Sequence, residues 1–414
     1  MINSKNVVVF NLGCKVNQYE CDVICDNLKS KGYQISQELE HADIYVINTC
    51  AVTAEAEKKS RQAIARCRAL NANAKILVVG CASQKNPQSF VKDNVTYISG
   101  VAGKFSIDSH LDSDIQDVDI KELPTVYEDG ELDSAYRTRS YIKIQDGCNN
   151  FCSYCIIPYL RGRSRSRRKE EIVKEIAKLS GFVQEIVLTG IDLMAYGLDI
   201  GYDLRTLIEE LEVFNLRIRL GSLYAERITQ ELLESLKKLK KFCPHFHLSM
   251  QSGDDGVLKS MNRHYTANVY KEKIDLIREY FPNATITTDI IVGFPTETEE
   301  AFLNTCEFVK EVNFSDIHIF PYSAREGTRA AKLSQLDKET VKMRKKILSN
   351  IKKDLVKKHL SDNLNKEHEV LVEEKVGEYY VGHTRNYIKV YLKENGEIVT
   401  TTPNKIYNDG LMEE

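Results

Sequence analysis

The chain has 414 residues, of which 42% are hydrophobic and 28% are charged, and its formal net charge is −3. This length predicts two or three domains, and the composition excludes a disordered or membrane-embedded protein. No apolar run approaches the ~18 residues that span a bilayer. The N-terminus lacks the ordered regions of a signal peptide, so we expect a cytoplasmic protein without a membrane partner. Eleven cysteines in such a protein indicate metal binding or catalysis rather than disulfides.

Three apolar, β-rich runs in residues 1–107 each end in a cysteine: Cys14, Cys50 and Cys81. Amphipathic stretches lie between these runs, a pattern that indicates a parallel, doubly wound α/β sheet. Ligands of such sheets bind beyond the carboxyl ends of the strands. The three cysteines are therefore expected to converge on one site. The alternative is a flavodoxin-like sheet with incidental cysteines.

Residues 108–136 interrupt this alternation with a strongly acidic segment. Between Asp108 and Asp133, ten acidic residues stand against one lysine, a local net charge of −9 that leaves about +6 for the rest of the chain. A solvated linker is the expected structure. The positive charge is concentrated in RGRSRSRRK (161–169) and in 338–358, so a nucleic-acid partner stays possible despite the acidic total.

A second alternating series occupies residues 137–336. Its expected strands are 141–147, 185–190, 217–222, 246–253, 285–294 and 316–323, with helical stretches between them. Six such units predict a partial (β/α)6 barrel whose open side would suit a bulky substrate. Residues 337–362 are expected to form one basic connecting helix. Period-two alternation in 363–414 predicts a small all-β, barrel-like domain.

The segment CNNFCSYC places Cys148, Cys152 and Cys155 on one short loop after the first strand of the barrel series. Three closely spaced thiolates match the ligation of an iron–sulfur cube and leave one iron with an open coordination position. The carboxyl end of a barrel strand is where such folds carry out chemistry. A zinc knuckle completed by a distant ligand is the alternative.

The segment 141–167 resembles the radical S-adenosylmethionine (SAM) methylthiotransferases. The runs NLGCKVNQYE (11–20), NTCAVT (48–53) and VGCASQ (79–84) match the first domain of that family, and GHTRNYIKV (382–390) fits its C-terminal TRAM domain. The resemblance implies two [4Fe–4S] clusters, one on Cys148, Cys152 and Cys155 that binds SAM, and one on Cys14, Cys50 and Cys81 that carries sulfur. Reductive cleavage of SAM to a 5′-deoxyadenosyl radical would then activate a C–H bond for insertion of a methylthio group. Because the cofactors carry this chemistry, no catalytic acid–base residue is expected.

The resemblance also implies cofactor contacts from loops and later strand ends. The candidates are Tyr154, Gly190, Asp192, Ser222, Gln251, Arg263 and Gly293. Gly293 could instead be only a turn residue, and Arg263 could simply pair with a carboxylate. The chain departs from the family pattern at Asp192, where relatives often have histidine, and around Tyr224, so the roles of these two residues stay open.

Members of this family act on tRNA adenosines beside the anticodon or on a ribosomal protein, so the expected partners are a tRNA anticodon stem-loop and a flavodoxin- or ferredoxin-class electron donor. The candidate phosphate contacts are Arg161, Arg163, Arg165, Arg167 and Arg168, since guanidinium groups suit phosphate oxygens. A solvated or acid-paired loop is the alternative. The run 15–18 (KVNQ) is most similar to the branch that acts on N6-threonylcarbamoyladenosine at position 37, with the isopentenyladenosine branch as the alternative.

Other cysteines and histidines receive no functional role. The lone cysteines are expected to be buried thiols, namely Cys21, Cys25, Cys67, Cys243 and Cys306. The tract 243–247 (CPHFH) resembles a metal-binding sequence. His245 and His247 would share one strand face, at the end of the sheet opposite the clusters, and ordinary hydrogen bonding is expected there.

The alternative from another functional class is a non-catalytic, zinc-bearing tRNA-binding protein. Anaerobic reconstitution with iron and sulfide should instead give a brown protein with broad visible absorption and about eight irons per chain, because two four-iron clusters require them. Iron analysis and an absorption spectrum measure this outcome. A colourless protein that retains zinc would contradict the cluster prediction.

Overall fold

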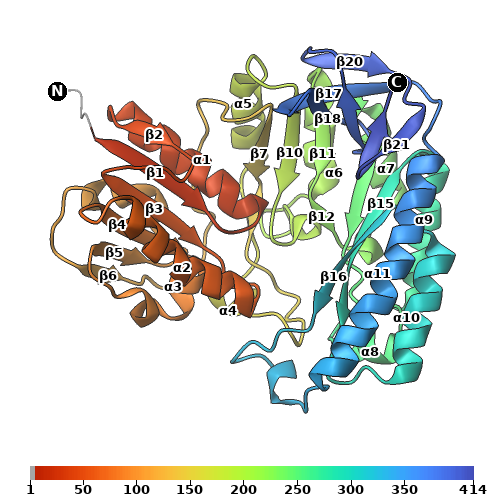
Figure 1. The fold of residues 1–414 in the computed structure, drawn as a ribbon, viewed down its shortest axis with the longest axis horizontal. Coiled ribbons are helices and arrows are strands. Elements are labelled where there is room, and N and C mark those ends of the chain that lie inside the picture. Colours follow the sequence, from red (N-terminus) through yellow and green to blue (C-terminus); the bar gives the residue numbers. More distant parts are fainter. Residues whose placement is uncertain (1–4) are drawn as a thin grey trace.

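The computed structural model describes residues 5–414, which form three consecutive units (Figure 1). The first unit is a parallel six-stranded sheet with the strand order β2-β1-β3-β4-β5-β6. Its strands are β1 (Asn6–Asn11), β2 (Gln34–Ser36), β3 (Ile44–Thr49), β4 (Lys75–Gly80), β5 (Val95–Ser99) and β6 (Asp117–Asp119). The helices are α1 (Lys15–Ser30), α2 (Ala54–Leu70) and α3 (Cys81–Lys85). The predicted doubly wound sheet is confirmed.

The central strand β3 shows why this sheet folds as it does. All six of its residues are buried. Tyr45 and Ile47 belong to the core on one face of the sheet, whereas Ile44 and Val46 belong to the core on the other. A strand covered on both faces needs a continuous apolar sequence rather than an alternating one, and β3 has such a sequence.

The acidic segment is more ordered than a solvated linker. Residues of β6 pair in parallel with β5, so Val118 lies opposite Ile98 at the sheet edge. Further along, the Asp26 carboxylate of α1 accepts hydrogen bonds from the backbone N–H groups of Asp133 and Ser134, at 2.8 and 3.1 Å. An edge strand has one free side in solvent, so charged residues are tolerated there.

The second unit is the partial barrel, built from two four-stranded parallel sheets. One sheet has the order β13-β11-β10-β7, with β7 (Arg139–Lys143), β10 (Glu185–Thr189), β11 (Arg217–Leu220) and β13 (Lys241–Phe242). The other has the order β12-β14-β15-β16, with β12 (Ser222–Leu223), β14 (His245–Leu248), β15 (Thr285–Val292) and β16 (Asp316–Pro321). The short strands β8 (Gln145–Asp146) and β9 (Arg165–Ser166) flank the cysteine loop. The predicted six-unit α/β barrel is confirmed.

The barrel helices begin where the sequence places capping side chains. They are α4 (Ile157–Arg161), α5 (Lys169–Leu179), α6 (Leu204–Glu210), α7 (Gln230–Lys238), α8 (Asp255–Ser260), α9 (Ala267–Tyr280) and α10 (Glu299–Val312). The N-cap oxygens of Asp203, Thr229 and Asp254 accept a backbone N–H of the first turn, as do those of Thr266 and Thr298. These caps satisfy amides that have no partner within the helix.

Both edges of the open barrel are covered. Helix α1 of the first unit packs against β7, and its Tyr19 and Val23 belong to the barrel core. At the other edge, α11 (Lys338–Ser361) lies against β16 and α10 (Figure 1). The first unit therefore forms part of the barrel wall.

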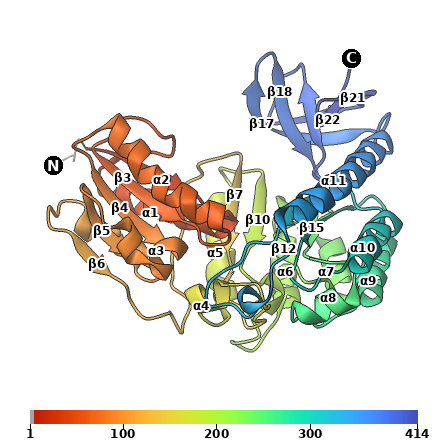
Figure 2. The same ribbon diagram turned by 60° about the horizontal axis from the view of Figure 1, so that its bottom comes forward.

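The third unit is a small mixed sheet beyond α11 (Figure 2). Its strands are β17 (His368–Val376), β18 (Tyr379–Thr384), β19 (Lys389–Leu392), β20 (Ile398–Thr401), β21 (Lys405–Tyr407) and β22 (Gly410–Met412). It contacts the amino end of the barrel through an ion pair between Arg217 and Glu369 of 2.8 Å. The predicted C-terminal all-β domain is confirmed. Within residues 5–414, every helix is too short or too polar to cross a bilayer.

Candidate functional site

The first cysteine trio follows three neighbouring strands. Cys14 is the N-cap residue of α1, Cys50 directly follows β3, and Cys81 begins α3 after β4. Burial raises the pKa of Cys50 to about 11, and the nearby thiol groups of Cys81 and Cys14 add to this increase. The structure therefore brings together the three cysteines that the strand pattern placed at one sheet edge.

The second trio lies on the loop between β8 and α4. Burial raises the pKa of Cys155 to about 12, with contributions from the neighbouring Cys152 and Cys148. The Cys148 sulfur accepts hydrogen bonds from the backbone N–H and the side-chain amide of Asn150, both at 3.4 Å. The Arg263 guanidinium donates to the Cys152 sulfur at 3.5 Å. The loop thus presents three clustered sulfurs with protein donors directed at two of them.

The donor set of the two trios bears on the kind of metal centre. Among residues 5–414, the only group of three or more potential ligand atoms within 4.8 Å of one another is His247, Asp289 and His318. A closed structural zinc site takes four ligands. Each trio supplies three thiol groups, which fits a four-iron cluster with one iron left open.

The two cysteine loops share one cavity. It has a volume of about 220 Å³, and its wall includes Thr53, which lies three residues after Cys50, and Tyr154, which precedes Cys155. Gln251 at the end of the barrel sheet also lines it. This cavity brings two of the predicted cofactor contacts, Tyr154 and Gln251, together with Thr53 from the segment that follows Cys50.

The remaining predicted cofactor contacts lie in several places. Arg263 stacks over the Tyr224 ring, 4.5 Å from its centroid, and beside the cysteine loop. Asp192 accepts a hydrogen bond of 2.8 Å from the side chain of Asn150, so it orients the residue that donates to Cys148. Burial raises the pKa of Asp192, although nearby Arg227 opposes this. Asp192 and Tyr224, which depart from the family pattern, therefore both lie beside the second trio.

At the two glycines predicted to contact a cofactor, Gly190 and Gly293, close packing within the protein already leaves little room for a side chain. A Cβ at Gly190 would lie 2.9 Å from the Gln145 side-chain oxygen, which accepts the Asp192 backbone N–H at 2.8 Å. Gly293 has φ of +74°, and a Cβ there would lie 2.5 Å from Val341 of α11. Gly293 therefore permits close packing of the connecting helix. Ser222 lines a second cavity, described below.

The five arginines do not form one exposed phosphate-binding surface as predicted. Arg161, Arg165 and Arg167 are at most 3% exposed, whereas Arg163 and Arg168 are exposed. The acid-paired alternative is therefore correct for three of the five. A guanidinium that is buried and paired with carboxylates cannot contact an RNA backbone.

The buried arginines bind carboxylates at the junction of the first unit and the barrel. Arg161 pairs with Glu20 at 3.0 Å and with Asp146 at 3.1 Å, and its Nε donates to the Cys81 sulfur at 3.2 Å. Arg165 pairs with Asp146 at 3.0 Å, and Arg167 pairs with Glu175. The role of Arg161 gave no signal in the sequence because its acidic partner Glu20 lies 141 residues away.

A second, larger cavity of about 570 Å³ lies inside the barrel, toward the C-terminal domain. Asp289 lines both cavities. Lys15 lines this larger cavity, and burial together with the guanidinium groups of Arg219 and Arg139 lowers its pKa to about 8. This cavity was not predicted from the sequence, although the polar residues that alternate along β14, β15 and β16 could have indicated it.

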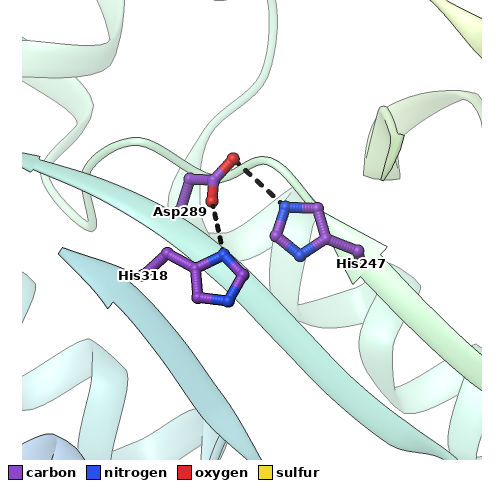
Figure 3. A group of neighbouring side chains, drawn as sticks. All are labelled: His247, Asp289 and His318. Atoms are coloured by element: carbon purple, nitrogen blue, oxygen red, sulfur yellow. Dashed lines mark hydrogen bonds and ion pairs between the residues drawn. The ribbon is translucent and has the colours of Figure 1, made fainter. Parts of the chain in front are cut away.

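Figure 3 shows the histidine–aspartate group in this wall. His247 and His318 contact opposite oxygens of Asp289, at 3.1 and 3.2 Å. The other ring nitrogen of His247 hydrogen-bonds to Thr287 at 2.9 Å. Although burial opposes it, hydrogen bonding to the two histidines lowers the pKa of Asp289, and the Asp289 carboxylate raises that of His318. Hydrogen bonding accounts for this group, as expected for His247, although its three members could also hold a metal ion.

Two family descriptions match the sequence: the Radical SAM superfamily over residues 142–309, and the uncharacterized protein family UPF0004 over residues 6–102. The chain is 38% identical over 413 residues to the threonylcarbamoyladenosine tRNA methylthiotransferase MtaB of Bacillus subtilis, covering 95% of this chain and 91% of that protein. It is 34% identical to the tRNA-2-methylthio-N(6)-dimethylallyladenosine synthase of Dictyoglomus thermophilum, covering 94% and 93%. The fold resembles that of the radical SAM methyltransferase TsrM from Kitasatospora setae, with a TM-score of 0.56, 15% identity and coverage of 80% and 77%.

The barrel and its three-cysteine loop define a radical SAM enzyme, a class that uses a [4Fe–4S] cluster and SAM. Within that class, the chain belongs to the tRNA methylthiotransferases. Its sequence identity to members of that family, over nearly the whole chain, shows this. These relatives are transferases, so the alternative of a non-catalytic tRNA-binding protein is wrong.

Substitution of the buried Arg161 should lower stability, whereas substitution of the exposed arginines of the same run should not. Arg161→Met leaves Glu20 and Asp146 with fewer partners, and removing one member of a buried ionic group costs about 3–5 kcal/mol. A marked fall in Tm is therefore expected, measured by thermal denaturation. The matched variants Arg163→Met and Arg168→Met should keep the parental Tm. Equal Tm values for all three would contradict the buried network.

The packing role of Gly293 can be tested against a second glycine with positive φ. Gly293→Ala should lower the free energy of unfolding by about 1–3 kcal/mol, since it adds a contact with Val341 to the backbone strain. Gly377 has φ of +61°, and a Cβ added there would meet no atom within 4 Å, so Gly377→Ala isolates the strain. Chemical denaturation of both variants measures the difference. An equal loss of unfolding free energy in both variants would show that the close approach of α11 to Gly293 does not contribute to stability.

Proposed function

We propose that this protein converts N6-threonylcarbamoyladenosine at position 37 of tRNA to its 2-methylthio derivative. The observation that supports this most directly is the cavity shared by the two cysteine loops, with Thr53 on one side and Tyr154 on the other. A reaction that joins a radical step to sulfur transfer needs both centres next to one space. The proximity of the reacting groups then replaces an improbable encounter in solution.

In this proposal, one [4Fe–4S] cluster binds SAM and is held by Cys148, Cys152 and Cys155. A second cluster is held by Cys14, Cys50 and Cys81. When bound, these cofactors supply one-electron cleavage of SAM and the sulfur for insertion at an unactivated C–H bond, with electrons from a flavodoxin- or ferredoxin-class protein.

The chain's own residues tune and orient the SAM-binding centre. Asn150 and Arg263 donate hydrogen bonds to the sulfurs of Cys148 and Cys152. Hydrogen bonds to ligand sulfurs and burial are the means by which a protein adjusts the potential of an iron–sulfur cluster. Asp192 fixes the Asn150 amide and so acts as a positioning residue.

The same proposal divides the chain by function. Residues 1–107 hold the sulfur-donating cluster, 137–336 form the SAM-binding barrel, and 337–362 connect it to an RNA-binding domain at 363–414. The acidic segment 108–136 adds the edge strand β6 to the first unit and then leads to the barrel.

The RNA would contact the exposed cations near these elements. Arg163 and Arg168 remain candidates after the burial of the other three arginines. The exposed lysines of α11 add a positive surface: Lys342, Lys345, Lys346, Lys353 and Lys357. Such contacts position a nucleic acid and make its affinity depend on salt.

Two observations favour the threonylcarbamoyl substrate over the isopentenyl substrate. The MtaB relatives from Bacillus subtilis and Aquifex aeolicus are each 38% identical, against 34% and 36% for the dimethylallyladenosine synthases of Dictyoglomus thermophilum and Thermoanaerobacter. The run 15–18 after the first cysteine is also most similar to that branch. The dimethylallyladenosine relatives support the isopentenyl substrate as the second candidate.

Nucleoside mass spectrometry of tRNA from a deletion strain tests the substrate. The strain should lose 2-methylthio-N6-threonylcarbamoyladenosine and accumulate the unmethylthiolated nucleoside, while its isopentenyl counterpart keeps the methylthio group. Complementation with the Cys148→Ala variant should not restore the product, whereas the Cys243→Ala variant should, since Cys243 is a buried thiol outside both trios. Loss of the methylthio group from the isopentenyl nucleoside alone would contradict the proposal.

A further inference from the structure

The larger cavity of about 570 Å³ is built by all three units of the protein. Lys15 comes from the first unit, Arg219 and His245 come from the barrel strands, and Tyr387 comes from the C-terminal domain. Asp289 lines both this cavity and the smaller one that contains Thr53 and Tyr154, so a group held here would lie beside the smaller cavity.

Two buried side chains in its wall each have a nitrogen without a partner. Arg219 is 1% exposed; its Nε lies 3.2 Å from Glu185, but its Nη2 makes no hydrogen bond among residues 5–414. His245 is 7% exposed, and its Nδ1 atom likewise has no partner within those residues. Nearly all buried polar groups in folded proteins are hydrogen-bonded. Two unpaired nitrogens on residues that line one cavity therefore favour a polar ligand there.

The cations of the wall are not fully neutralised. Glu185 lies 3.2 Å from the Nε atoms of both Arg139 and Arg219, so one carboxylate serves two guanidinium groups. Arg139 has a second acidic partner in Glu373. No carboxylate in the described part of the chain lies within ion-pair distance of Lys15. With Glu185 and Glu373 beside the two guanidinium groups, Lys15 is the cation of this side that has no matching carboxylate.

The acidic residues of the wall are, in contrast, each paired. Asp289 contacts two histidines, as Figure 3 shows. Asp316 pairs with Lys352 at 2.8 Å, and Asp409 pairs with Lys389 at 2.6 Å. None of these three carboxylates lies within ion-pair distance of Lys15 or Arg219 in the described part of the chain. A lysine without a carboxylate partner in the wall favours an anionic ligand beside it.

We propose that Lys15 and Arg219 bind the carboxylate of the threonyl group on the substrate nucleoside and thereby determine its specificity. This inference rests on the proposed function. A threonylcarbamoyl group has one carboxylate, whereas an isopentenyl group has no charged or polar atom. Ammonium and guanidinium donors form strong charge-assisted hydrogen bonds with a carboxylate. The unpaired His245 nitrogen provides a further partner for the hydroxyl or urea of the same group.

This arrangement also explains how an uncharged side group would be rejected. A substrate without the carboxylate would leave the Arg219 Nη2 group buried and unpaired and would leave Lys15 without an anionic partner. Sites built to bind a polar group discriminate strongly against analogues that lack it, because the buried partners then stay unsatisfied. Lys15 is also part of the run 15–18 whose pattern favoured the threonylcarbamoyl branch.

The test compares two anticodon stem-loop RNAs that differ only in this charge: one with N6-threonylcarbamoyladenosine, and one in which the carboxylate is a carboxamide. With the reconstituted full-length enzyme, the wild type should prefer the acid RNA by about tenfold or more, both in Kd and in kcat/KM. In Lys15→Gln this preference should fall at least tenfold, and Lys15→Arg should restore most of it. Kd is measured by fluorescence anisotropy without reductant.

The control variant is Lys29→Gln, because Lys29 is an exposed lysine on the same helix. It should keep the full preference for the acid RNA. Lys15 adjoins Cys14, so iron content and visible absorption are recorded for each variant. The comparison of Kd values between acid and carboxamide RNA does not depend on turnover.

Three results would overturn this inference, and they are distinguishable from one another. If the wild type methylthiolates and binds both RNAs equally, the carboxylate is not recognised, although the proposed function stands. If the wild type modifies only an isopentenyladenosine stem-loop, the proposed function fails and the inference fails with it. An acid preference that survives in Lys15→Gln would exclude Lys15 as a carboxylate-binding residue.

Discussion

A buried ionic group around Glu20 sets the relation between the two cysteine loops. Glu20 lies on α1 and is fully buried, and it contacts Lys104 at 2.8 Å, Arg161 at 3.0 Å and Lys143 at 3.4 Å. These cations come from the first unit, the helix after the second cysteine trio and the first barrel strand. Removing one partner from such a group leaves a desolvated charge, so the three segments are held in one arrangement.

Apolar packing supports the same junction. Ile156, Ile157 and Leu160, from the segment directly after the second trio, belong to the core of the first unit together with Ala82. The loop that carries one set of cysteines is thus embedded in the domain that carries the other. A close-packed core has low compressibility, so this packing holds the loop of the second trio in a fixed position against the first unit.

The buried cations also bear on the chemistry of the first trio. Lys104, Lys143, Arg161 and Arg165 stand against two carboxylates in this group, and the Arg161 guanidinium donates to the Cys81 sulfur. Burial raises the pKa of Cys81, and Arg161 opposes it, as a neighbouring positive charge favours the thiolate. One network therefore holds the domains together and favours the thiolate form of Cys81. Of this run of arginines, only Arg163 and Arg168 lie outside the network and are exposed, so only these two could contact an RNA backbone.

The sequence by itself determined the parallel sheet, the six-unit barrel and the small C-terminal sheet, because local residue patterns indicate which strands are buried and where helices begin. It also determined which six cysteines form two sets, since three follow successive strand ends and three share one loop. Only the tertiary structure decided that Arg161 is buried against Glu20 and that Lys15 reaches the cavity of Arg219. Those contacts join residues far apart in the chain, and the hydrophobic periodicity of a single helix or strand does not predict them. Whether an arginine faces solvent or a carboxylate depends on which distant segment packs over it.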